Sequence, residues 1–120
     1  MVIYGKKHSC ANDKCEKIRE KLIKSDEYVK SVEKASEIFS LLGEPARIKI
    51  VLALMEGELC VYHICDITGG KQSATSQHLR KLKDGNIVKA KKVGNQVLYS
   101  IADEHVKTII NTAILHHDCD

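Results

Sequence analysis

Long apolar stretches are absent from this sequence of 120 residues. A helix that crosses a membrane needs about 20 consecutive apolar residues, and no run in the chain approaches that length. Residues 1–7 also lack the long apolar segment that a secretory signal peptide requires. We therefore expect a cytoplasmic protein without membrane contacts.

Signatures of catalysis are absent as well. The sequence has no nucleophile elbow, no phosphate-binding glycine loop and no pair of catalytic acids. We therefore expect a protein that is not an enzyme. A small metalloenzyme is the least favoured alternative. The sequence offers four candidate ligands for one metal ion, described below, and a metal held by four protein ligands has no open position for water and substrate.

Cysteines are few and odd in number. The five are Cys10, Cys15, Cys60, Cys65 and Cys119. In a chain expected in the cytoplasm, an odd number argues against a disulfide framework and for metal or thiol chemistry. The alternative is that some are buried as small apolar side chains, a role that suits Cys65 best.

Positive charge is concentrated in one segment. Residues 71–95 hold seven lysines and arginines but only one acidic residue, Asp84, so the segment carries +6. Because the whole chain carries +3, the remainder carries −3. A basic block in an otherwise slightly acidic chain indicates a polyanionic partner such as DNA.

Residues 72–83 have helical spacing and a polar outer face. Thr75, Leu79 and Leu82 recur at i, i+4 and i+7, as in a stripe that faces a core. The other side carries amides, hydroxyls and cations, which are the groups that contact base edges and phosphates. A short helix over residues 61–68, a Gly69-Gly70 turn and this helix form a helix-turn-helix pattern. The alternative is an ordinary solvated surface helix.

The periodicity changes after Gly85-Asn86. Apolar residues alternate over residues 88–93 and 97–101, on either side of Gly94-Asn95, which predicts a β-hairpin. A helix-turn-helix followed by a basic hairpin indicates a winged helix-turn-helix: a mainly α fold with a small β-hairpin that binds double-stranded DNA. The expected DNA contacts are Gln72, Ser73, Thr75, Ser76, Gln77, His78, Arg80, Lys81, Lys91, Lys92, Asn95 and Gln96.

Helical spacing also precedes the helix-turn-helix. Residues 16–42 predict one broken helix or two, interrupted around Ser25-Asp26. Pro45 suits the first turn of another helix, over residues 46–56, which Gly57 ends. Its expected buried stripe is Ile48, Val51, Leu52 and Met55.

A last helix begins after Asp103, a good N-cap residue. Its apolar stripe is Val106, Ile109, Ile110, Ala113 and Ile114. This stripe is too apolar to leave in water, so we expect a partner subunit to cover it in a twofold homodimer. The chain is thus divided into an N-terminal arm and helix, residues 1–30, and a winged helix-turn-helix domain with a C-terminal dimerisation helix, residues 31–120.

Four residues near this helix have side chains that suit zinc: Asp103, His105, His116 and Cys119. His105 and His116 lie roughly 16 Å apart along one helix, too far for a single metal ion. Antiparallel pairing of two copies would bring Asp103 and His105 of one to His116 and Cys119 of the other. The alternative is that Asp103 is only a cap and that His116 and His117 form a frayed polar end.

Four segments together resemble the ArsR/SmtB family, and the resemblance covers residues 35–119. They are Leu42-Gly43-Glu44-Pro45-Ala46-Arg47-Ile48-Lys49-Ile50, Glu58-Leu59-Cys60-Val61, Ser76-Gln77-His78-Leu79-Arg80-Lys81-Leu82 and Val97-Leu98-Tyr99-Ser100-Ile101. The resemblance implies a winged-helix dimer that represses metal-efflux or detoxification genes and releases DNA on binding metal.

The resemblance also implies two sensing sites. The zinc sensors' site between C-terminal helices matches Asp103, His105 and His116, while Cys119 replaces the usual His or Glu and Asp120 competes for that place. This set suits Zn(II), and the softer fourth ligand widens tolerance for Cd(II). A hydrogen-bond link from His116 to Asn86 is implied as well.

The second implied site resembles that of the cadmium, lead and arsenic sensors. Their Cys-Val-Cys motif reads Cys60-Val61-Tyr62 here, so one thiolate is missing. Cys10 and Cys15 resemble N-terminal cysteines that reach over from the other subunit. With Cys60 they would form a three-thiolate site for Cd(II), Pb(II) or As(III), with His8 or His63 as a fourth ligand. Cys65 matches a third cysteine position of some arsenic sensors.

One alternative is a repressor of the same fold that responds to thiol oxidation instead of metal. Cys60 with Cys119, or Cys10 with Cys15, would pair on oxidation, giving a thiol- or persulfide-responsive repressor. In that case an oxidant alone releases DNA.

Overall fold

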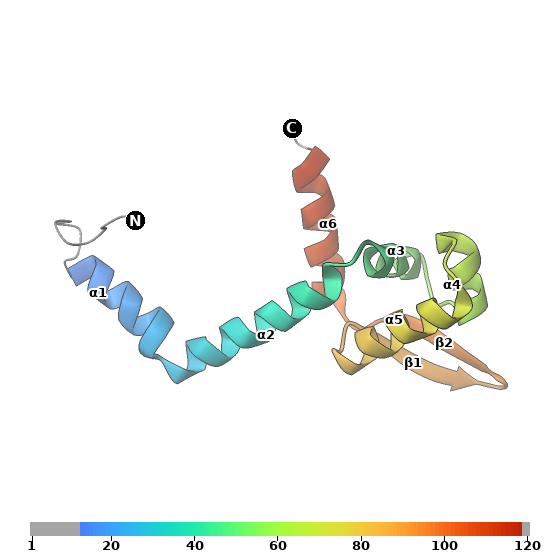
Figure 1. The fold of residues 1–120 in the computed structure, drawn as a ribbon, viewed down its shortest axis with the longest axis horizontal. Helices are drawn as coiled ribbons and strands as arrows, with labels where there is room; N and C mark the ends of the chain where they lie inside the picture. Colours follow the sequence, from blue (N-terminus) through green and yellow to red (C-terminus); the bar gives the residue numbers. More distant parts are fainter. Residues whose placement is uncertain (1–12, 119–120) are drawn as a thin grey trace. The chain divides into compact units, whose positions relative to one another are not determined.

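The structure is a computed structural model that describes residues 13–118 (Figure 1). The chain divides into two units at Ser36–Glu37. Its elements are α1 (Asp13–Arg19), η1 (Glu20–Lys24), α2 (Asp26–Leu42), α3 (Pro45–Leu54), α4 (Val61–Thr68), α5 (Gln72–Asp84), β1 (Val88–Val93), β2 (Gln96–Ile101) and α6 (Glu104–Asp118).

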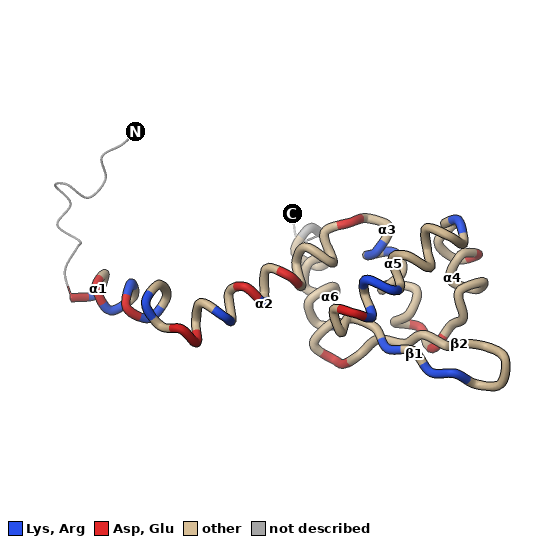
Figure 2. Tube along the Cα trace, turned by 60° about the horizontal axis from the view of Figure 1, so that its bottom comes forward, with Lys and Arg blue, Asp and Glu red and all other residues tan. Residues whose placement is uncertain are grey.

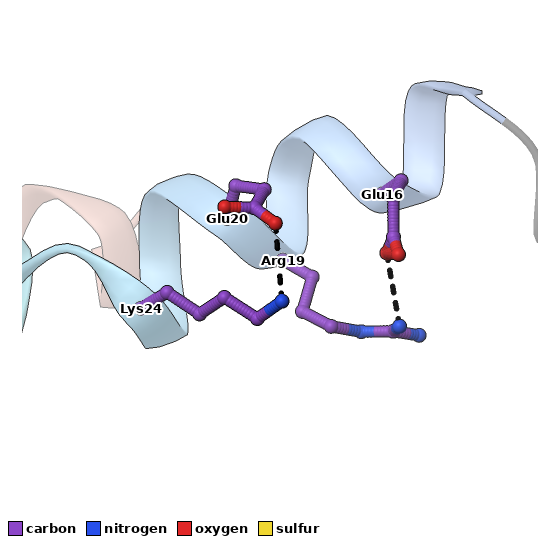
Figure 3. Close-up of polar contacts among 4 residues, drawn as sticks. All are labelled: Glu16, Arg19, Glu20 and Lys24. Carbon is purple, nitrogen blue, oxygen red and sulfur yellow. Dashed lines mark hydrogen bonds and ion pairs between the residues drawn. The ribbon is translucent and has the colours of Figure 1, made fainter.

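The first unit begins with α1, which continues into η1, a π-helical turn. Figure 3 shows two ion pairs along this stretch: Arg19 Nη1 lies 3.0 Å from Glu16 Oε1, and Lys24 Nζ lies 3.1 Å from Glu20 Oε1. No residue of α1 or η1 is buried. Its apolar side chains, including Leu22 and Ile23, therefore face solvent within this chain.

The predicted break between the first two long helices is confirmed at Ser25. The backbone of Ser25 is extended, with ψ of 120°, and its Oγ accepts a hydrogen bond from the Tyr28 amide at 3.4 Å. A serine side chain can satisfy one of the amides that a helix start leaves without a partner. The chain therefore stops one helix and begins another at this residue.

The core of the second unit joins α3, α4, α5, the hairpin and α6. Its completely buried side chains include Val51, Ile64, Leu79 and Leu82. The expected stripe of α3 is partly wrong, because Leu52 is 36% exposed whereas Ile50 is buried. Residues 48 and 50–54 of α3 are all apolar, so periodicity could not select the face that meets α4, α5 and β2.

The predicted glycine turn between α4 and α5 is confirmed. Gly69 ends α4 with φ of 78°, a left-handed conformation that costs glycine little, and its amide donates to the Cys65 carbonyl at 2.8 Å. At Gly70 an added Cβ would lie 2.8 Å from Thr75 Oγ1. Gly69 is therefore needed for its left-handed conformation, whereas Gly70 is needed because a larger residue would come too close to the Thr75 side chain.

The predicted wing is a two-stranded antiparallel hairpin in which Val88 pairs with Ile101 and Val93 with Gln96. Gly94 and Asn95 form its two-residue turn, and Gly94 has φ of 62°. Leu59, just before α4, exchanges two backbone hydrogen bonds with Tyr99, of 3.1 and 2.8 Å. The wing is thereby tied to the start of the helix-turn-helix.

α6 begins as predicted, because the Val106 amide donates to Asp103 Oδ1 at 3.2 Å. Its predicted apolar stripe is divided: Val106 and Ile110 are buried in the core of their own chain, whereas Ile114 is 37% exposed. Leu115, outside that stripe, is 63% exposed. Across residues 13–118, no helix combines the length and apolar character required to span a bilayer. These elements confirm the predicted winged helix-turn-helix fold.

Candidate nucleic-acid interface and metal-ligand positions

The predicted DNA-contacting face of α5 is exposed. Thr75, Leu79 and Leu82 turn inward, each no more than 3% exposed. The exposed polar residues of the helix are Gln72, Ser73, Ser76, Gln77, Arg80, Lys81, Lys83 and Asp84. Amides, hydroxyls and a guanidinium on one helix face can donate to and accept from base edges and phosphate oxygens.

Two expected contacts lie elsewhere. Thr75 was expected both in the core and on the DNA-contacting face, and its burial to 3% removes it from that face. His78 is half-buried, and its Nδ1 accepts a hydrogen bond from Arg47 Nε at 3.1 Å. The helical period places position 78 between the buried face and the DNA-contacting face of α5. The hydrogen bond from the buried Arg47 therefore decides which way the His78 side chain points.

The four expected wing residues, Lys91, Lys92, Asn95 and Gln96, are all exposed. Lys91 Nζ lies 3.3 Å from Glu58 Oε2 in the loop before α4. Figure 2 shows basic residues on α5 and on β1. Cations on both elements suit a partner with regularly spaced phosphates, since neutralising phosphates supplies much of the affinity for DNA.

A groove of about 370 Å³ connects the helix to the wing. Its lining residues are Ser76, Gln77, Arg80, Lys83, Asp84 and Tyr99. Sequence reasoning did not assign Lys83 and Tyr99 to this surface. The signal for Lys83 was its place three residues after Arg80 on the same helix face. Tyr99 lines the groove from β2, whose neighbouring strand β1 contacts α5.

The structure brings together two of the four predicted zinc ligands. Asp103 Oδ1 lies 3.6 Å from His105 Nδ1, and both side chains are exposed, at 53% and 92%. His116 is exposed farther along the same helix, and Cys119 and Asp120 lie outside the described residues. Within residues 13–118 no three His, Cys, Asp or Glu side chains gather around one point.

The predicted thiolate residues are distributed over both units. Cys60 is 5% exposed at the N-cap of α4, and its Sγ lies 3.7 Å from His63 Nδ1. Cys15 lies on α1 in the other unit, and Cys10 and His8 fall outside the described residues. Cys65 is half-buried, so among the cysteines of residues 13–118 Cys60, not Cys65, is the buried one.

Asn86, the residue predicted to link the metal site to DNA binding, lies just after Gly85, the C-cap of α5. It is exposed, and its φ of 62° places it in the left-handed region. Its amide donates to the Lys83 carbonyl at 3.0 Å, which closes the end of the helix. Asparagine tolerates this conformation better than most residues, so its local role is to end α5.

Comparison with known proteins agrees with this arrangement. The family model described as bacterial regulatory protein, arsR family, matches residues 44–90, from α3 into β1. A cadmium resistance transcriptional regulatory protein CadC homolog of Staphylococcus aureus is 42% identical over 82 residues, which are 68% of this chain and 68% of that protein. The repressor SmtB of Mycobacterium tuberculosis is 39% identical over 82 residues, 68% of this chain and 61% of that protein.

Solved structures show the same fold. A homodimeric winged helix-turn-helix DNA-binding domain of Mycobacterium bovis, a possible ArsR-family transcriptional regulator, matches with a TM-score of 0.72 and 28% identity. The match covers 78% of this chain and 87% of that one. These relatives regulate transcription and are not enzymes, in agreement with the predicted class. The chain belongs to the ArsR/SmtB family of winged helix-turn-helix transcriptional regulators.

Proposed function

We propose that the protein is a homodimeric repressor that releases operator DNA when it binds Zn(II) or Cd(II), and so controls metal-efflux or detoxification genes. The observation that carries the proposal is the ligand pair at the start of α6, Asp103 and His105, whose side chains are 3.6 Å apart and exposed. His116 is exposed on the same helix. Carboxylate and imidazole groups suit Zn(II).

Dimerisation through N- and C-terminal helices would complete this set. Leu115 on α6 is 63% exposed and Phe39 on α2 is 64% exposed, and large apolar side chains of this kind favour a protein partner. The related M. bovis domain is homodimeric. If two α6 helices pair antiparallel, Asp103 and His105 of one copy face His116 and Cys119 of the other. The proposal assigns residues 1–30 to an arm and helix and residues 31–120 to this dimerising domain.

Metal binding would act on DNA binding through linkage. A metal held between two subunits favours one intersubunit geometry, and DNA favours the geometry that spaces two α5 helices along the double helix. A difference of a few kcal/mol between the two geometries is enough for a switch. His116 would pass the change to Asn86 at the end of α5.

The thiolate residues are proposed as a second site. Cys10, Cys15 and Cys60 would hold Cd(II), Pb(II) or As(III), with His63 close enough to Cys60 to join them, at 3.7 Å. Thiolates prefer these softer ions over hard cations. The similarity to the S. aureus cadmium-resistance regulator supports this second site.

The test is fluorescence anisotropy of a duplex taken from upstream of the protein's own gene, with reduced, metal-free protein. We expect tight binding that added Zn(II) abolishes, and His116→Ala to retain binding but lose the zinc response. Thr112→Ala is the matched control, because Thr112 is exposed on the same helix. DNA release by zinc from the His116→Ala variant would remove the α6 site from the proposal.

Two further arms separate the alternatives. Release by Cd(II) but not Zn(II) assigns sensing to Cys10, Cys15 and Cys60, and a Cys60→Ser variant should then abolish it. Release by an oxidant such as hydrogen peroxide, with no response to metal, replaces the metal sensor with a thiol switch.

A further inference from the structure

A guanidinium is buried beneath the recognition helix α5. Arg47, on α3, is only 8% exposed. Burying a cation is costly unless hydrogen-bond acceptors replace its water. Arg47 has two hydrogen-bond acceptors and one ion-pair partner, all in the second unit, and they come from different parts of the fold.

The three partners join α2, α3 and α5. Arg47 Nε donates to His78 Nδ1 on α5 at 3.1 Å, and its Nη1 donates to the Leu41 carbonyl in the last turn of α2 at 3.3 Å. The carboxylate of Glu44, at the N-cap of α3, lies 3.8 Å from Nη2. The planar guanidinium offers several donors in fixed directions, so it can hold two elements at a set separation.

The hydrogen bond defines the direction of His78. Arginine can only donate, so the Nδ1 atom of His78 is the acceptor in this contact. The ring also lines a cavity of about 370 Å³ between α3 and the glycine turn, together with Lys49, Thr68 and Gly70. His78 is therefore directed into the domain and not along the exposed face of α5.

A second contact holds the C-terminal end of α5 to the same turn of α2. A Cβ added at Gly85, which ends α5, would overlap Leu41 Cδ1. The φ of Gly85 is −89°, so the position needs glycine for its small size and not for its conformation. Positions 78 and 85 are roughly 10 Å apart along a helix. Leu41 thus meets α5 at two separated points: through its carbonyl and Arg47, and through its side chain.

We propose that Arg47 is a positioning residue for DNA recognition, which acts through His78 to align α5 against the last turn of α2. Its burial prevents direct contact with DNA. Hydrogen bonds to base edges tolerate little displacement of the helix, whereas the attraction between cations and phosphates tolerates more. Loss of the Arg47–His78 bond therefore weakens binding to the preferred sequence and leaves general affinity for DNA unchanged.

The test measures binding of the full-length protein to two duplexes of equal length. One is selected by the wild-type protein from a random-sequence library, and the other is its shuffled sequence. Arg47→Met and His78→Leu should each lower affinity for the selected duplex about tenfold, with changes within about twofold for the shuffled one. The salt dependence of binding should not change, because no phosphate contact is lost.

Two further variants identify the hydrogen bond as the cause. His78→Gln should retain most of the selectivity, because its Oε1 can accept from Arg47 Nε. The double variant Arg47→Met, His78→Leu should bind the selected duplex no worse than either single variant, since both remove the same interaction. The matched control is Lys49→Met, which removes an exposed cation from the same helix and should not change the preference between duplexes.

Several outcomes would overturn the proposal. If Arg47→Met lost affinity equally for both duplexes and its binding depended less on salt, Arg47 would contribute to DNA affinity through its charge. Losses that add in the double variant, or a His78→Gln variant as weak as His78→Leu, would indicate that His78 contacts DNA itself. If thermal unfolding shows that Arg47→Met does not fold, the comparison of His78→Leu with His78→Gln replaces it. Unchanged selectivity in His78→Leu then refutes the positioning role of Arg47.

Discussion

At the scale of single residues, Asp103 caps a helix and is also a proposed metal ligand, and chemistry can separate the two roles. Its Oδ1 accepts the Val106 amide at 3.2 Å as the cap of α6, and the same atom lies 3.6 Å from His105 Nδ1. Capping needs an acceptor oxygen but no charge, whereas a zinc ligand is better as an anion. The proposed metal site and the start of the helix therefore share one carboxylate.

Substitutions of Asp103 should separate these tasks. Asp103→Asn keeps an acceptor for the Val106 amide, so we expect its stability in urea to match the wild type while its response to zinc weakens. Asp103→Ala loses the cap as well and should be destabilised by about 1 kcal/mol. Equal zinc responses in Asp103→Asn and the wild type would show that the carboxylate is not a ligand.

At the scale of elements, the wing and the recognition helix are each held by contacts outside themselves. Leu59 pairs with Tyr99 in β2, and Lys91 in β1 forms an ion pair of 3.3 Å with Glu58. Both Glu58 and Lys91 are exposed, so the pair adds little to stability. If Lys91 contacts a DNA phosphate as proposed, Glu58 competes with that phosphate for the lysine.

The two partners of this ion pair should affect DNA binding in opposite directions. Lys91→Ala should weaken binding to all sequences alike and lower the salt slope by about one, as expected for one lost phosphate contact. Glu58→Gln should strengthen binding, since it frees Lys91. Affinities measured over a range of salt concentrations test both, and an unchanged slope in Lys91→Ala would place this lysine off the DNA.

The close approach of α5 to α2 gives a prediction on stability. Gly85→Ala would force Leu41 to move, so we expect destabilisation by about 1–3 kcal/mol from overpacking. Adding Leu41→Ala should make room for the methyl group, and the double variant should then be no less stable than Leu41→Ala alone. Urea unfolding of the three variants measures this coupling, and additive losses would mean that the two residues do not meet.

At the scale of the whole molecule, one chain leaves apolar side chains without cover. Leu115 is 63% exposed near the end of α6, although Val106 and Ile110 of the same helix are buried. Leu115 follows Val106 by nine residues, which places it on the opposite side of the helix. One face of α6 thus anchors the helix to its own domain, and the other remains for a partner.

A charge at position 115 should separate dimerisation from folding. Leu115→Glu should produce a folded monomer, because a side chain that is 63% exposed contributes little to the core of its own chain. Sedimentation velocity and circular dichroism measure the two properties, and affinity for DNA should fall as paired binding is lost. The control is Ile67→Glu, which charges a 60% exposed apolar side chain on another helix, α4; a dimeric Leu115→Glu protein would place the interface elsewhere.

Local patterns in the sequence were sufficient for the winged helix-turn-helix. The buried stripe of α5, the Gly69-Gly70 turn and the Gly94-Asn95 hairpin turn each depend on residues within one or two turns of chain, so periodicity and glycine placement predict them. The basic segment that begins at Lys71 predicted the class of partner for the same reason, since charge can be counted without coordinates.

Other features depended on contacts between distant residues, which only the tertiary structure decided. The face of α3 that is buried could not be selected from a segment that is apolar on most sides, and position 78 lay between two faces of α5. Arg47 and His78 are 31 residues apart, and no local pattern marks a buried guanidinium. The sequence by itself determined which elements form, because their periodicity is local, whereas the packing of those elements decided which side chains remain available to DNA and metal.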